Sequence, residues 1–268
     1  MDLELLKVEE IERVLVVVAH PDDAEYGLSV AVNSFTAAGK EVGYLLLTAG
    51  EAGIRDMEPA KTKALRAHEQ RAACQEVGVE HLTILDFPDG EMEYGLDVRK
   101  AVAKEIREFQ PDTVAVINFD FLARWGINHI DHRVTGEAVA DAIRDADNPW
   151  THRDLDVEPW KADRLLISGS STPTHRLLVT DADVQAGVRS LEQHKVYLEA
   201  LPDHPKPADF IPAMVSGEGE EKYLSLRVVN MYSGEVGASF VCSIFWTICT
   251  GLRCGNHFVP VTLRLCRS

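Results

Sequence analysis

The feature that most constrains the fold is an apolar run that stops at a cluster of ionisable side chains. Residues 14–19 read Val-Leu-Val-Val-Val-Ala, and His20, Asp22 and Asp23 follow almost at once. Such a uniformly apolar, β-branched run is typical of a strand buried on both faces of a parallel sheet. Residues 28–38, which end before Gly39, have the length and alanine content of a helix. The ionisable groups are therefore predicted on a strand-to-helix turn, at the sheet edge where open α/β folds bind ligands.

This turn has two interpretations. In the structural one, an aspartate caps the helix and His20 fills the loop, which accounts for one carboxylate. It accounts less well for two adjacent carboxylates, because they repel each other unless a cation or a proton lies between them. His20 and Asp23 can instead converge on one divalent metal and leave Asp22 free as a base. We favour the metal site.

The rest of the chain alternates between apolar strands and amphipathic helices. Strands are predicted at 41–48, 81–85, 113–118, 163–168 and 175–179, and helices at 60–76, 96–109, 131–146 and 183–201. This order predicts an α/β, Rossmann-like three-layer fold with a mostly parallel sheet and an active site at the carboxyl ends of the strands. A proline-rich segment at 202–207 suggests a boundary between a catalytic domain at 1–205 and a C-terminal β-rich extension at 206–268, packed on the same domain.

A second polar cluster follows the strand at 113–118. It contains His129, Asp131 and His132 at the start of the next helix. In the structural interpretation Asp131 caps that helix and both histidines lie on the surface. Beside the first cluster, one imidazole can face a metal while the other faces a neighbouring pocket. Two strand ends would then supply the three-ligand open site expected of catalytic zinc. The isolated His175 and His194 are not candidates.

Composition restricts the partners. The net charge of −16 argues against nucleic acid or an anionic membrane as the main partner. No stretch reaches the ~18 apolar residues of a membrane span, and the acidic N-terminus lacks the basic region of a secretory signal, so we expect a cytoplasmic protein with a small substrate. Four of the five cysteines lie in the acid-free tail at 238–268, and all five are predicted to be free thiols.

The two clusters together resemble a known family. The motif AHPDDAEYG at residues 19–27, with the later His129-x-Asp131-His132, is similar to the LmbE-like, PIG-L-type zinc deacetylases, which remove the acetyl group from N-acetylglucosamine units. The resemblance covers about residues 13 to 200. It includes the turn at 48–53, Arg66-x-x-Glu69 and Asp89-Gly90.

The resemblance implies roles for individual residues. One Zn²⁺ per chain would be held by His20, Asp23 and His132, with Asp22 as general base. His129 would stabilise the oxyanion or act as an acid, oriented by Asp131, and Arg55 would contact the substrate. The usual proline of the second motif is Ile130 here, which affects the loop geometry and the aim of His129.

The implied function is a zinc-dependent hydrolase that removes the acetyl group from an N-acetylglucosamine-containing small molecule or glycoconjugate. An amidase acting on another N-acyl sugar or a thiol conjugate is the alternative. A magnesium-binding regulatory module is less consistent with His129 and His132, which suit zinc better. Assembly as a homo-oligomer stays open. Phe121 and Trp125 would either stack on a sugar or anchor their loop.

Overall fold

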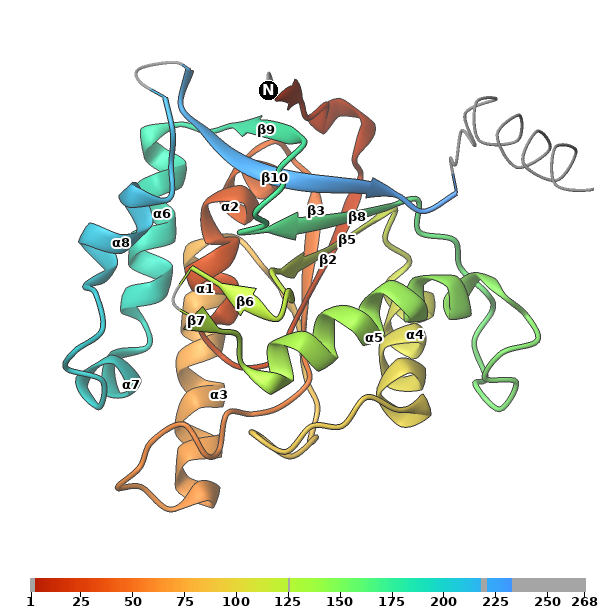
Figure 1. Cartoon of the computed structure of the whole chain (residues 1–268), viewed down its shortest axis with the longest axis horizontal. Helices are drawn as coiled ribbons and strands as arrows, with labels where there is room; N and C mark the ends of the chain where they lie inside the picture. Colours follow the sequence, from red (N-terminus) through yellow and green to blue (C-terminus); the bar gives the residue numbers. More distant parts are fainter. Residues whose placement is uncertain (1–2, 125, 218–220, 233–268) are drawn as a thin grey trace, which may run out of the picture. The chain divides into compact units, whose positions relative to one another are not determined.

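The computed structural model describes residues 3–124, 126–217 and 221–232, and its centre is an eight-stranded sheet (Figure 1). The strand order is β1-β9-β10-β8-β5-β2-β3-β4. The strands are β1 (Glu4–Leu5), β2 (Arg13–Val18), β3 (Glu41–Leu46), β4 (His81–Ile84), β5 (Thr113–Ile117), β8 (Arg164–Ser168), β9 (His175–Leu178) and β10 (Tyr223–Asn230). Only β10 runs antiparallel to its neighbours in this sheet of the described residues. The predicted mostly parallel α/β fold is confirmed.

Helices cover both faces of the sheet and make three layers. The helices are α1 (Asp23–Gly27), α2 (Ser29–Ala37), α3 (Pro59–Glu76), α4 (Leu96–Phe109), α5 (Ile130–Asp147), α6 (Asp181–Glu192), α7 (Lys195–Glu199) and α8 (Pro207–Ala213). In Figure 1, α4 and α5 pack together on one side, whereas α2, α3, α6 and α8 lie on the other.

The position of strand β2 explains why its sequence is uniformly apolar. Val14, Val16 and Val18 face the core under α2 and α6. Leu15 and Val17 face the core under α4 and α5. Strand β2 pairs with β3 on one edge and with β5 on the other, so it lies inside the sheet. Because helices cover both of its faces, neither face is exposed. Because β2, β3, β4 and β5 run parallel, the turns that follow them lie at one edge of the sheet, and the polar clusters of the sequence lie there too.

The helix predicted at 183–201 differs from the observed structure. It begins at Asp181, because Thr180 and Asp183 form a capping box. It is also divided into α6 and α7 at Gln193 and His194. A short hairpin of β6 (Leu122–Ala123) and β7 (Gly126–Ile127) occupies the loop between β5 and α5.

The predicted C-terminal extension is described only in part. Between residues 206 and 232 the structure has helix α8 and strand β10, and β10 joins the main sheet. The acid-free tail at 238–268 lies outside the described residues, as does Trp125. The boundary at residue 205 stays a prediction. None of the described helices combines the length and the apolar character that a membrane span requires.

Candidate metal centre and active site

The turn after β2 separates its two carboxylates. The backbone N–H of His20 donates a hydrogen bond of 2.8 Å to Asp23 Oδ2, which folds the turn back on itself. Asp22 has a φ of 86°, in the left-handed region that few residues other than glycine adopt. As a result the side chain of Asp23 contacts His20, whereas that of Asp22 contacts α3.

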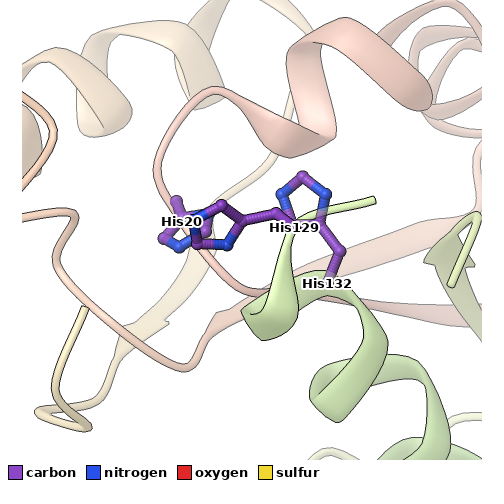
Figure 2. A group of neighbouring side chains, drawn as sticks. All are labelled: His20, His129 and His132. Carbon is purple, nitrogen blue, oxygen red and sulfur yellow. The ribbon is translucent and has the colours of Figure 1, made fainter. Parts of the chain in front are cut away.

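The carboxylate of Asp23 lies between two imidazoles. Its Oδ1 is 2.9 Å from His132 Nε2, and its Oδ2 is 3.3 Å from His20 Nδ1. The other ring nitrogen of His132 is 3.1 Å from Asn128 Oδ1. Figure 2 shows the rings of His20, His129 and His132 gathered beside the first turn of α5. The structure therefore brings together the three residues that the resemblance implies as ligands.

His20 belongs to two groups that can hold a metal. One consists of His20, His129 and His132, and the other of His20, Asp89 and Asp131. His20 Nε2 is 3.0 Å from both Asp89 Oδ1 and Asp131 Oδ2. The sequence argument noted Asp89 only as part of an Asp-Gly turn. Its position on the turn that follows β4, at the same sheet edge as His20, was the signal that could have marked it as part of the site.

The charges of this cluster favour a cation. Burial lowers the pKa of His20, but the carboxylates of Asp23, Asp131 and Asp89 outweigh it and raise that pKa well above its usual value. Burial alone would raise the pKa of Asp23, but the imidazoles of His132 and His20 hold that pKa well below its usual range. Imidazole and carboxylate groups around a buried positive charge make a donor set that suits a divalent metal.

Asp131 orients His20 and contacts His129 through its backbone. Its fully buried carboxylate accepts hydrogen bonds from the N–H of Gly90 at 2.6 Å and of Met92 at 3.2 Å. Its own N–H donates to His129 Nδ1 at 3.3 Å, whereas its carboxylate stays 3.9 Å from that atom. Since Nδ1 of His129 accepts a hydrogen bond, the neutral ring carries its proton on Nε2.

The pKa of His129 is lowered rather than raised. Burial is the main cause, and the nearby His20 adds to it, while Asp131 acts in the opposite direction. The sequence analysis related His129 only to Asp131, whose carboxylate alone would raise the pKa of the ring. A neutral His129 still donates a hydrogen bond from Nε2, so either charge state can stabilise an oxyanion.

Asp22 is paired with a buried arginine on α3. Arg66 Nη2 lies 2.8 Å from Asp22 Oδ1, its Nη1 donates to Gly50 O at 3.1 Å, and its guanidinium stacks 3.8 Å from the ring centroid of Tyr197. Gly50 has a φ of +66°, and a Cβ there would lie 2.1 Å from Arg66 Nη1, so only glycine fits. Burial raises the pKa of Asp22 to about 6 against the lowering effect of Arg66, a value suited to a general base.

Two of the residues considered for substrate contact lie on the surface. Arg55 is exposed on the loop between β3 and α3. Phe121 is 60% exposed beside the β6–β7 hairpin, next to the equally exposed Leu122 and Ile127. Their roles stay predictions.

Comparison with known proteins gives a match to one family model. Residues 15–143 match the family model described as PIG-L, GlcNAc-PI de-N-acetylase, and this segment holds every histidine and aspartate of the site described above. The chain is similar to the PIG-L family over these residues. The resemblance predicted from the sequence is confirmed.

Sequence relatives of this protein are deacetylases. A diacetylchitobiose deacetylase from Thermococcus kodakarensis is 28% identical over 252 residues, which cover 90% of this chain and 87% of that protein. A probable N-acetyl-alpha-D-glucosaminyl L-malate deacetylase 2 from Bacillus anthracis is 31% identical over 137 residues, which cover 48% of this chain and 58% of that protein.

Solved structures share the fold. The N,N'-diacetylchitobiose deacetylase from Pyrococcus horikoshii superposes with a TM-score of 0.73 at 22% identity, covering 87% of this chain and 90% of that one. The 4-carboxy-2-hydroxymuconate hydratase from Pseudomonas putida has a TM-score of 0.61 at 19% identity, covering 85% of this chain and 100% of that one. Because a hydratase shares this fold, the reaction has to be argued from the site and from sequence relatives.

Proposed function

We propose that this protein is a zinc-dependent hydrolase that removes the acetyl group from an N-acetylglucosamine-containing small molecule or glycoconjugate. The observation that carries the proposal is the position of Asp23 between His20 and His132, with the buried carboxylate of Asp22 beside it. The names of the sequence relatives support the same reaction.

His20, Asp23 and His132 would hold one zinc ion. Two imidazoles and a carboxylate form a donor set used by catalytic zinc sites, which leave one coordination position open. When bound, zinc would supply an activated water and polarise the acetyl carbonyl. The net attraction of this carboxylate-rich site for positive charge fits such an ion.

Asp22 and His129 would perform the proton transfer and the charge stabilisation. The ionised carboxylate of Asp22 takes a proton from the attacking water, whose oxygen bonds to the amide carbon. His129 Nε2–H donates to the developing oxyanion, and the loss of such a donor typically costs about 10²–10³ in rate. The C–N bond then breaks, the amine nitrogen receives the proton from Asp22, and acetate and a free amine leave.

The substrate class comes from the relatives. Their names specify diacetylchitobiose and an N-acetylglucosaminyl malate, so the shared chemical unit is N-acetylglucosamine. Arg55, which is exposed on the loop after β3, would contact the substrate. We expect the protein to act in the cytoplasm. An amide on another N-acyl sugar or on a thiol conjugate would need the same chemistry and differ only outside the acetyl group.

The test combines metal analysis with an assay of amine release. The protein is purified without added metal, its zinc is quantified, and free-amine release is measured with diacetylchitobiose, N-acetylglucosaminyl malate and other N-acyl sugars, before and after chelation. We expect near-stoichiometric zinc and chelator-sensitive release from at least one N-acetylglucosamine compound. Zinc without any amine release would refute the proposed reaction, and a protein that binds no transition metal would refute the proposed metal site.

A further inference from the structure

A fully buried polar layer lies beneath Asp22 and takes no part in the chemistry proposed above. It consists of Glu25 on α1, Gln70 on α3 and His194 at the start of α7, each with 0% exposed surface. Buried polar groups of this kind destabilise a fold unless they are paired, so their presence requires an explanation.

Asp22 depends on this layer for its backbone conformation. A residue with a side chain is strained at a φ of 86°, and such a conformation persists only where its surroundings fix it. The backbone N–H of Asp22 donates a hydrogen bond of 3.1 Å to Gln70 Oε1. This N–H is buried. If the Gln70 acceptor were removed, the Asp22 N–H would have no hydrogen-bond partner in this conformation.

Glu25 determines which way the amide of Gln70 points. Gln70 Nε2 donates to Glu25 Oε1 at 2.9 Å, and an ionised carboxylate can only accept. The amide nitrogen must therefore face Glu25, which leaves the amide oxygen facing the N–H of Asp22. The order of donors and acceptors fixes one orientation of Gln70 that suits Asp22.

His194 extends the layer to the α6–α7 junction. Its Nε2 lies 3.4 Å from Glu25 Oε2, so the buried imidazole faces the buried carboxylate. Three residues later, Tyr197 stacks on Arg66, the arginine paired with Asp22. The α6–α7 segment is therefore linked to Asp22 by two sets of contacts. One runs through Glu25 and Gln70, and the other runs through Arg66.

We propose that Gln70 is a positioning residue that holds Asp22 in its left-handed conformation for proton transfer, with Glu25 orienting the Gln70 amide and His194 packed against Glu25. This inference rests on the proposed function only for the role of Asp22 as base. Without its hydrogen bond to Gln70, the backbone of Asp22 relaxes toward a common conformation and its carboxylate turns away from the attacking water. The metal-binding residues stay in place.

The first experiment replaces Gln70 with leucine, which has a similar volume. We expect Gln70→Leu to lower kcat about 100-fold, the cost of misplacing a reacting group by about 1 Å, and to leave KM and bound zinc close to wild type. The matched control is Gln75→Leu, on the same helix but exposed, which should leave kcat, KM and zinc unchanged. Gln70→Leu with wild-type kcat would overturn the proposal.

An exchange of the two side chains separates hydrogen bonding from packing. Gln70→Glu alone preserves the shape but places two buried carboxylates face to face, so kcat should fall. Adding Glu25→Gln restores both hydrogen bonds and the same total charge, with the amide at position 25 now donating to the carboxylate at position 70. We expect the double variant to recover kcat to within a few-fold of wild type. A double variant no more active than Gln70→Glu alone, at equal thermal stability, would refute the proposed orientation by Glu25.

A structural readout tests the inference without any assay. A crystal structure of Gln70→Leu, or of Gln70→Glu if the leucine variant does not fold, should show Asp22 outside the left-handed region. An unchanged φ and carboxylate position would overturn the proposal even if the wild-type protein released no amine. Failure of the wild type across all substrates, together with a displaced Asp22 in the variant, would refute the proposed function and retain the positioning role.

Discussion

The guanidinium of Arg66 is paired with the carboxylate of Asp22 at 2.8 Å, and both side chains are buried. Removal of one partner leaves the other charge buried and uncompensated, which costs about 3–5 kcal/mol in comparable pairs. We therefore expect Arg66→Met to lower the free energy of unfolding by about that amount in urea titrations. Arg71→Met, on the exposed side of the same helix, should stay within about 0.5 kcal/mol of wild type. Equal effects of the two substitutions would show that the buried pair contributes little.

Cys74 is predicted to be chemically inert in the folded protein. Burial raises its pKa to about 12, and only the thiolate is an effective nucleophile. At pH 8 the thiol is protonated, so iodoacetamide should leave the Cys74 peptide unmodified, and the labelling rate should increase as the pH rises toward 12. In denaturant the pKa returns to about 8.5 and the same peptide should be labelled at pH 8. Rapid labelling of the native protein at pH 8 would contradict the burial of Cys74.

Binding of the metal and turnover should respond differently to two substitutions in the site. Asp22→Asn removes the proposed base but none of the proposed ligands, so zinc should be retained while kcat falls about 10²–10⁴-fold. His132→Ala removes a proposed ligand, and both zinc and turnover should be lost. His175→Ala on β9 is the control for a histidine outside the site. Near-normal turnover of Asp22→Asn would refute its assignment as the base.

Much of the fold follows from local pattern. The run at 14–19 predicts a central strand because only a strand enclosed on both faces and both edges tolerates such uniform burial, and β2 has this position. The carboxyl ends of parallel strands lie at one edge of a sheet, and this rule predicts that the residues after β2 and after β5 meet. The contact between Asp23 and His132, which are separated by 109 residues, follows from that rule.

The supporting residues could not be predicted in the same way. His194 follows a helical pattern that predicts one continuous helix, whereas the structure divides this segment at His194 and buries the imidazole against Glu25. The resemblance implied that Asp131 orients His129, yet the carboxylate of Asp131 is nearer to His20. Contacts between elements depend on how helices pack and how side chains are oriented, and no local periodicity encodes either.

His129 provides the substitution that best separates the two possible uses of its imidazole. Its Nδ1 accepts the N–H of Asp131 and caps α5, while Nε2 is free to donate. Asparagine is a good N-cap residue and lacks a donor at the reach of Nε2, so His129→Asn should preserve thermal stability. If His129 stabilises the oxyanion, bound zinc stays at wild-type level and kcat/KM falls about 10²–10³-fold. If His129 is instead a ligand, as its grouping with His20 and His132 permits, zinc is lost together with turnover. Titration of zinc against the variant and the wild type, run beside the amine-release assay, distinguishes the two outcomes, and unchanged values in both would exclude His129 from either role.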